Sequence, residues 1–361
     1  MDKKVGIVTF HRALSYGANL QAYALQNFLF KLGIDNEIID YKCQYMIDHY
    51  QKTFRKTNSN FLKRLVWNIR TAKTIRQKRF CTENFVSRHL KLSKPYNSEG
   101  LSDCNKIYRA FITGSDQVWS PTCVGFDPVY FLTFADNDKK YSYAASIATK
   151  TIPDNLKSEY VNRLKDFSGV SLREQSGADL VSELTGKQAL VHIDPSMLLT
   201  VNDWNKICTT PQFESPYILM FTVPAQKNLL NYALKLSEEK NCKILWLNYF
   251  GKKHRSKRIK YISAVEITDF IGLIKNAEYV CTNSFHGNAF SLLYHKNFVV
   301  ETDTASKKNV RSEDLMLSLD LKARILSTNN KPDIDDNTDW LKIDKKLDEF
   351  RMISKEYLSK I

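Results

Sequence analysis

The chain has 361 residues, of which 43% are hydrophobic and 25% charged, a composition that excludes a disordered or fibrous protein. This length exceeds the size at which one hydrophobic core keeps growing, so two domains are expected. The formal net charge of +14 indicates attraction to an acidic partner, such as a phosphate-bearing ligand, nucleic acid or an anionic lipid surface.

The first 205 residues alternate short apolar strands with amphipathic helices, which is typical of a doubly wound parallel sheet. Strands are predicted over residues 5–10, 37–41, 110–114, 141–146, 170–173 and 190–193, and helices over 20–33, 153–167 and 177–184. The sequence therefore predicts a Rossmann-like domain over residues 1–205.

The connection from His11 to Asn19 is longer than the usual strand-to-helix loop, and long loops at this edge of an α/β sheet tend to hold ligands. Its one glycine, Gly17, fits neither a dinucleotide-binding fingerprint nor a P-loop. We therefore predict that the loop and the next turn line a cleft for some other ligand, or form a purely structural loop. The predicted cleft-lining residues are His11, Arg12, Gly17, Asn19 and Gln21.

A basic helical insertion is predicted at about residues 51–95. Ten cations and no acidic residue lie between Gln51 and Thr82, and an apolar stripe runs through residues 61–69, which also include Trp67. The helix over about 52–80 either contacts an anionic membrane surface or packs its stripe on the first domain and leaves the cations in water. Both interpretations remain open.

A polar cluster follows the strand at 110–114. The hydroxyl, carboxylate, amide and indole groups of Ser115, Asp116, Gln117 and Trp119 suit a sugar acceptor, because sugars need paired donors and acceptors and an aromatic platform. The alternative is a polar turn with a buried tryptophan.

The second domain is predicted over residues 206–335. Its strands are expected at 217–223, 244–249, 279–282 and 298–301, and its helices at 227–239, 267–276 and 287–294. A final helix, within residues 336–361, is predicted to pack back across the first domain. The predicted fold is thus α/β, with two Rossmann-like domains facing across a cleft.

The segment Thr282 to Gly287 lies between a strand and a helix. Helix N-termini present free backbone N–H groups, so Ser284, Gly287 and Asn288 are candidate anion contacts, and His286 is a candidate proton donor. A capping motif with a hydrogen-bonded histidine is the alternative reading.

Further cations follow other strands. Arg173 ends the strand at 170–173 and either clamps an anion or pairs with Glu174. Lys307, Lys308 and Arg311 follow the strand at 298–301 and either close over a phosphate or lie in solvent. No metal-binding motif is present, so no metal is predicted.

Five segments, in order, resemble the polysaccharide pyruvyl transferase family. They are Val5 to Gln26, Thr113 to Trp119, Ser171 to Glu174, Ile193 to Pro195, and Thr282 to Gly287. The resemblance implies a fold similar to GT-B glycosyltransferases, phosphoenolpyruvate as co-substrate with no other cofactor, and a sugar of a capsular polysaccharide or exopolysaccharide, or its lipid-linked precursor, as acceptor. The product it implies is a pyruvate ketal.

By the same resemblance, His286 corresponds to the family's donor-site histidine, with Ser284, Gly287 and Arg173 as candidate anion contacts, and Asn288 and Arg311 are further candidates for the donor site. Asp116 is predicted to act as the base on an acceptor hydroxyl. The alternative function is a glycosyltransferase that uses a nucleotide-sugar donor on the same architecture. Nucleic-acid binding through the basic stretch is not favoured, because it would leave the strand-end motifs without a role.

The predicted location is cytoplasmic. The seven cysteines include no C-x-x-C pair, and their odd number argues against a disulfide framework. Three of the first four residues are charged, which leaves no room for a secretory signal, and no run of about 18 apolar residues occurs. We expect no membrane-spanning helix.

Overall fold

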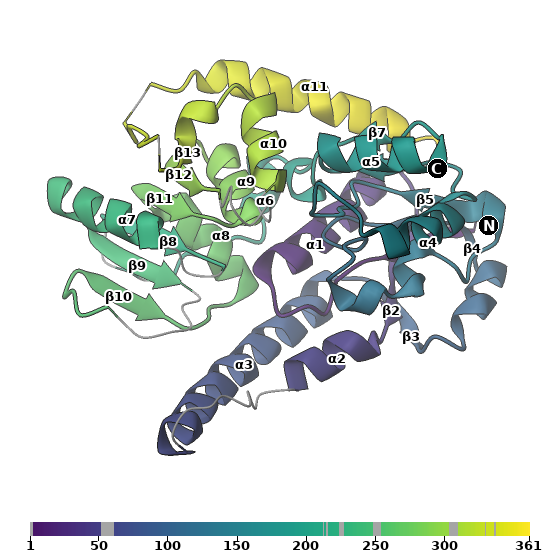
Figure 1. Cartoon of the computed structure of the whole chain (residues 1–361), viewed down its shortest axis with the longest axis horizontal. Coiled ribbons are helices and arrows are strands. Elements are labelled where there is room, and N and C mark those ends of the chain that lie inside the picture. Colours follow the sequence, from purple (N-terminus) through teal and green to yellow (C-terminus); the bar gives the residue numbers. More distant parts are fainter. Residues whose placement is uncertain are drawn as a thin grey trace.

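The computed structural model describes residues 3–51, 61–211, 213, 216–223, 227–247, 254–302, 310–328, 330–335 and 337–361. Two parallel sheets with flanking helices form the two halves of the molecule, and α1 lies between them (Figure 1). Lys307 and Lys308 lie outside the described residues, as do residues 52–60 between α2 and α3.

The first sheet has the strand order β3-β2-β1-β4-β5, and its paired strands are parallel. Its strands are β1 (Lys4–Val8), β2 (Asn36–Tyr41), β3 (Leu92–Tyr96), β4 (Tyr108–Thr113) and β5 (Lys140–Ser142). The short parallel pair β6 (Ser171–Leu172) and β7 (Leu190–Val191) continues beyond β5 through single bridges such as Ala145 with Leu172. The helices of this half are α1 (Tyr16–Lys31), α2 (Gln44–Gln51), α3 (Phe61–His89), α4 (Asp154–Leu164), α5 (Gln175–Thr185) and α6 (Val201–Asn205).

The second sheet has the order β10-β9-β8-β11-β12-β13 and is also parallel. Its strands are β8 (Tyr217–Phe221), β9 (Lys243–Leu247), β10 (Ile259–Ile262), β11 (Tyr279–Thr282), β12 (Asn297–Glu301) and β13 (Ile325–Leu326). Its helices are α7 (Lys227–Glu239), α8 (Ile267–Asn276), α9 (Phe285–Leu293) and α10 (Val310–Ser318), and α11 (Trp340–Leu358) follows.

Both sheets therefore reverse their strand order at one point, between β1 and β4 in the first and between β8 and β11 in the second. Ligands of open α/β sheets bind at the carboxyl ends of the strands at such a point. The predicted motifs that follow β1, β4 and β11 all lie at these two positions, so the topology places them where a ligand site is expected.

The two halves share one hydrophobic core. A single cluster of buried side chains includes Leu20 and Leu25 of α1 together with Phe270 of α8 and Phe290 of α9. The ring of Tyr16 stacks on that of Phe270 at 4.8 Å, and the Tyr16 hydroxyl accepts a hydrogen bond from the amide of Val265. These contacts explain why α1 begins at Tyr16 and not at residue 20 as predicted.

The last helix, α11, crosses from the second half to the first (Figure 1). Near its start, Trp340 stacks on His295 at 4.8 Å. Near its end, the hydroxyl of Tyr357 donates to the carbonyl of Ser142, at 2.8 Å, and Arg109 donates to the carbonyl of Ile361. The helix thus joins the outer parts of both sheets.

Some elements were not predicted from the sequence, namely α2, β3, α6, β10, α10 and β13. The long helix α3 was predicted. Its C-terminal part packs on α1 through the rings of Phe85 and Tyr23, 6.0 Å apart, and its N-terminal part projects from the body of the molecule (Figure 1). Within the residues that the structure describes, no helix is both long and apolar enough to cross a bilayer.

Candidate active site

Asp194 is the centre of a buried polar cluster between the two halves. Its Oδ2 accepts hydrogen bonds from Ser115 Oγ at 2.9 Å and from Arg173 Nη1 at 2.5 Å, and its Oδ1 accepts from the amide and hydroxyl of Ser196. Burial alone would raise the pKa of Asp194, but the neighbouring His286 and Arg173 hold it well below its usual range. Asp194 therefore stays ionised, and its carboxylate holds one side of the Arg173 guanidinium in place.

His286 lies in the first turn of α9, and its Nε2 is 3.6 Å from Oδ1 of Asp194. The ring is 7% exposed and packs against the backbone of Gly17 in the first turn of α1. Its Nε2 has no hydrogen-bond partner among the described residues. The imidazole is thus held between the two halves, with Nε2 facing the Asp194 carboxylate and Nδ1 against Gly17.

Two guanidinium groups lie next to the histidine. The side chains of Arg173 and Arg311 are 2% and 13% exposed, and both approach Oδ1 of Asp116, at 3.9 and 3.7 Å, without hydrogen-bonding it. Both also lie over the ring of Phe285, at 4.3 and 6.0 Å from its centroid. The structure thus brings Arg173 and Arg311, both predicted to bind an anion, together in one place.

These two cations are incompletely paired. Nε and Nη2 of Arg173 and Nε of Arg311 are buried without a hydrogen-bond partner in the part of the chain described. Burial, and next the positive charge of Arg173, lower the pKa of Arg311 to about 10. Buried charged donors without acceptors are costly, so this cluster has the properties of an anion-binding site.

A cavity of about 280 Å³ lies beside the cluster. Arg173, Asp194 and Arg311 line it together with the apolar side chains of Phe285, Met197, Leu315 and Phe350, whereas His286 and Asp116 do not. A small anion with a short carbon skeleton matches this lining. Among the described residues, no three His, Cys, Asp or Glu side chains are placed to hold a metal ion.

Asp116 stands at the edge of this cluster in a left-handed backbone conformation, with φ of 79°. Its Oδ1 accepts from the amide of Gln117 at 2.9 Å, and both residues are partly exposed. The Asp116 carboxylate is thus directed at the two arginines and remains accessible, as a group that acts on a ligand must be.

Several residues predicted to line the cleft instead hold the first loop in place. His11 and Arg12 both bind the carboxylate of Asp40. His11 Nε2 lies 3.1 Å from Oδ1, and Arg12 donates from Nε to Oδ1 at 2.6 Å and from Nη2 to Oδ2 at 2.8 Å. Asn19 donates to the carbonyls of Ala13 and Ser15, and Gln21 donates to Thr9 and Ala18. His11, Asn19 and Gln21 are buried, because the loop closes on itself. Their predicted place on the cleft surface is wrong.

Trp119 also differs from the prediction. It is fully buried, its indole N–H donates to the carbonyl of Tyr130 at 3.0 Å, and its ring stacks on Phe131 at 5.6 Å. The tryptophan belongs to the core of the first half and offers no platform to a sugar. Ser115 is buried as well, and its hydroxyl serves Asp194.

The start of α9 is a capping motif next to the site. The hydroxyl of Ser284 accepts from the amide of Gly287 at 3.5 Å, as an N-cap does. A side chain at position 287 would meet Thr282 Oγ1 at 2.5 Å, so Gly287 serves packing and not the close approach of a ligand. Asn288 is fully buried, and its amide has no partner in the described part of the chain.

Comparison with known proteins assigns the chain to a family. The sequence model of the polysaccharide pyruvyl transferase family matches residues 16–302. The chain belongs to this family. It is therefore a transferase of polysaccharide biosynthesis, and the match covers all the residues of the Asp194 cluster except Arg311.

Several solved structures are similar to this family member. A protein from Listeria monocytogenes assigned as a UDP-N-acetylglucosamine 2-epimerase is 9% identical, covers 99% of this chain and 91% of its own, and has a TM-score of 0.51. A UDP-GlcNAc 2-epimerase from Methanocaldococcus jannaschii is 15% identical, covers 97% and 92%, and has a TM-score of 0.44. A heptosyltransferase from E. coli is 13% identical, covers 84% and 91%, and has a TM-score of 0.38. No curated protein matches the sequence.

The Listeria alignment spans both halves, and the GT-B-like α/β fold predicted for this family member is confirmed. At 9% identity the likeness concerns the fold alone.

Three residues of the cluster had no predicted role, Asp194, Ser196 and Phe285. Asp194 could have been suspected, because it follows a predicted strand and stands in one of the segments that resemble the family. Phe285 had no signal of its own, since an aromatic residue after a strand is more often a core residue.

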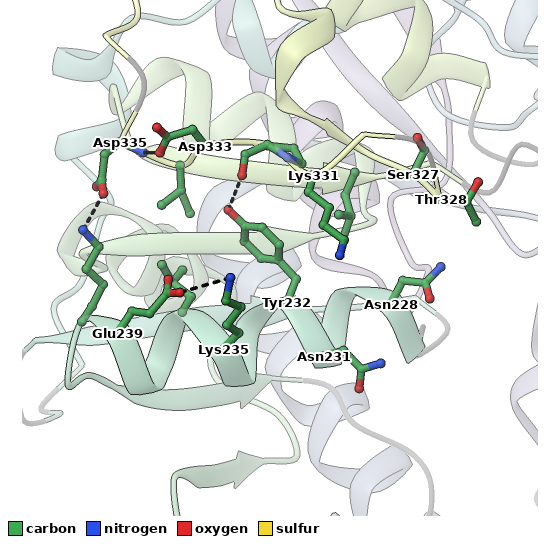
Figure 2. Close-up of a pocket in the computed structure, with 15 residues that line it drawn as sticks. Asn228, Asn231, Tyr232, Lys235, Glu239, Ser327, Thr328, Lys331, Asp333 and Asp335 are labelled. Carbon is green, nitrogen blue, oxygen red and sulfur yellow. Dashed lines mark hydrogen bonds and ion pairs between the residues drawn. The ribbon is translucent and has the colours of Figure 1, made fainter.

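A larger groove of this family member lies elsewhere. It has a volume of about 700 Å³ between α7 and residues 326–328 and 331–335, and Figure 2 shows its polar rim. The hydroxyl of Tyr232 donates to the carbonyl of Pro332 across it, and Lys240 pairs with Asp335 at one end. None of the predicted site residues lines this groove, so its size does not mark the active site.

Proposed function

We propose that this chain transfers the enolpyruvyl group of phosphoenolpyruvate to two hydroxyls of a sugar in a capsular polysaccharide or exopolysaccharide, or in its lipid-linked precursor. The product is a pyruvate ketal. The observation that carries the proposal is the pair of buried guanidinium groups of Arg173 and Arg311, with three N–H-bearing nitrogens that lack an acceptor among the described residues.

Phosphoenolpyruvate has the chemistry that these groups require. Its carboxylate and phosphate supply two anions for two guanidiniums, which bind such groups in a fork geometry. Its three-carbon skeleton suits the ring of Phe285, which lines the 280 Å³ cavity beside the guanidiniums. Binding would thus satisfy donors that are buried and unpaired in the free protein.

The reaction needs an acid, a base and an anion site. Protonation of the CH2 carbon of phosphoenolpyruvate, for which His286 is the candidate acid, makes the neighbouring carbon electrophilic. One sugar hydroxyl forms a bond to that carbon and loses its proton, the bond from carbon to the phosphate oxygen breaks, and the second hydroxyl takes the vacated position. One released proton restores His286, and the other leaves with phosphate.

Asp116 is the candidate base for an acceptor hydroxyl. It is partly exposed at the carboxyl end of β4, and its carboxylate lies within 4 Å of both guanidiniums. A sugar bound over the end of the first sheet would therefore meet the donor where the two halves join. The acceptor hydroxyl would lose its proton to a carboxylate beside the donor's anion site.

Thermal unfolding with phosphoenolpyruvate tests the donor. A ligand that binds only the folded state raises the melting temperature, so the wild type should be stabilised, and Arg311→Gln and His286→Ala should be stabilised less. UDP-N-acetylglucosamine serves as a nucleotide-sugar comparison. If phosphoenolpyruvate gives no shift and the nucleotide-sugar gives a clear one, the assignment moves to glycosyl transfer.

The second part of the proposal is contact of α3 with an anionic membrane, where lipid-linked sugars reside. Lys73 and Arg76 are exposed on this helix, and the ring of Phe80 is 63% exposed, which suits an interfacial helix. Flotation with phosphatidylglycerol liposomes should fall in the variant Lys73→Glu/Arg76→Glu and not in Lys322→Glu, an exposed cation of the second half. Equal flotation of all three proteins would reject membrane contact through α3.

A further inference from the structure

A second cavity, of about 260 Å³, lies where α2 and α3 meet the carboxyl edge of the first sheet. Arg12 follows β1 and Lys42 follows β2, and both line it, together with Met46 and Ile47 of α2 and Arg79 of α3. Strand β1 lies between β2 and β4 in the sheet. The cavity is therefore on the same edge as Asp116, which follows β4.

Its charges are mostly cationic. The Arg12 fork is held by the buried carboxylate of Asp40, which fixes the guanidinium in place. Within the described ranges, no carboxylate lies within 4 Å of the Lys42 ammonium or the Arg79 guanidinium, and both side chains are exposed. Glu83 is the one acidic residue of the lining, so two unpaired cations and a paired one face a single carboxylate.

The rest of the lining is apolar. Leu14, Met46 and Ile47 are partly buried and contribute hydrocarbon surface next to the cations. A bare phosphate would use only the cations, and a neutral sugar would use neither feature. A phosphate ester with a hydrocarbon chain matches both, because its head needs positive charge and its chain needs apolar surface.

We propose that this cavity binds the phosphate-linked end of a lipid-linked acceptor, with Lys42 and Arg79 on the phosphate and Leu14, Met46 and Ile47 on the first carbons of the chain. The inference rests on the proposed function, since it specifies the class of its acceptor. The sugar of such an acceptor would extend over the end of β1 toward Asp116. The lipid chain would continue between α2 and α3 toward the projecting end of α3 (Figure 1).

Binding of geranyl phosphate, a short soluble isoprenoid phosphate, tests the cavity directly. Isothermal titration of the full chain should give a Kd at least about tenfold weaker in Lys42→Gln/Arg79→Gln than in the wild type, because charged groups supply the hydrogen bonds to the phosphate. The matched control is Lys322→Gln/Lys331→Gln, which removes two exposed cations of the second half and should bind as the wild type does. Inorganic phosphate and geraniol should each bind at least tenfold more weakly than geranyl phosphate.

An unchanged Kd in Lys42→Gln/Arg79→Gln would overturn the inference. So would loss of phosphatidylglycerol vesicle binding in this variant with an unchanged Kd for geranyl phosphate, because the cations would then serve the bilayer surface. His286→Ala should bind geranyl phosphate normally. A failure here therefore differs from a failure of the donor assignment, which is measured with phosphoenolpyruvate.

Discussion

Gly17, in the first turn of α1, packs directly on the imidazole of His286, in the first turn of α9. A methyl group at position 17 would lie 1.9 Å from Nδ1 of His286, so the ring would have to move. We expect Gly17→Ala to lose most of the transferase activity and of the stabilisation by phosphoenolpyruvate, at a stability cost of about 1–3 kcal/mol. Gly100→Ala, where the nearest atom is 3.5 Å away, is the matched control. Full activity of Gly17→Ala would contradict a role for the placement of this ring.

We expect Arg311 to lower the stability of the protein while it contributes to donor binding. Its charge is disfavoured in the free protein, since burial and the charge of Arg173 lower its pKa to about 10 from a usual 12.5. We expect Arg311→Gln to raise the free energy of unfolding, by on the order of 1 kcal/mol, while it weakens phosphoenolpyruvate binding. Chemical denaturation without and with phosphoenolpyruvate measures both effects. A destabilised variant with normal donor binding would show that Arg311 is structural.

His192 predicts a pH dependence of stability. It is buried, its Nδ1 is hydrogen-bonded with the Ser171 hydroxyl at 2.7 Å, and its pKa is lowered by burial to about 4. The unfolded chain, with a histidine pKa near 6.5, then binds more protons between these two values, so stability rises with pH from about 4 to 6.5. The full effect is about 3 kcal/mol at most. Urea denaturation at pH 5 and pH 7 should show a smaller difference in the free energy of unfolding for His192→Gln than for the wild type. An equal difference in the two proteins would show that His192 is not the source of the pH dependence.

A substitution of Trp119 should change the stability of the protein but not acceptor binding. Because its indole N–H is used inside the core, Trp119→Phe should lower the free energy of unfolding by on the order of 2 kcal/mol and leave the KM for the acceptor unchanged. Calorimetry and steady-state kinetics with one acceptor sugar measure the two quantities. A raised KM with normal stability would restore the sugar platform predicted from the sequence.

The alternation of apolar strands and helices was sufficient to predict the α/β class and most strands of both sheets, because a buried parallel sheet requires continuous apolar runs. Strand β3, Leu92–Tyr96, was missed since it contains Lys94 and Pro95 at an edge where both are tolerated. Strand β13 has two residues and carries no pattern. Helix α10 was not predicted, although Arg311 within it was named as a ligand contact.

In the candidate site, the sequence located the strand ends but not the direction of the side chains. Arg173, Arg311, Asp116 and His286 converge in one cluster, whereas His11, Asn19 and Trp119 turn into the protein. The difference depends on partners far away in the chain. Asp40 for His11 and the carbonyl of Tyr130 for Trp119 are contacts that no local pattern contains.

The shared core around α1 limits how such enzymes can be recombined. Because Tyr16 and Gly17 pack on Phe270 and His286, the first helix is fitted to the half that follows residue 206. A chimera that joins the first half of one relative to the second half of another would bring together unmatched surfaces at this helix. Exchange of acceptor specificity should therefore succeed more readily by transplanting α2 and α3 than by swapping whole halves.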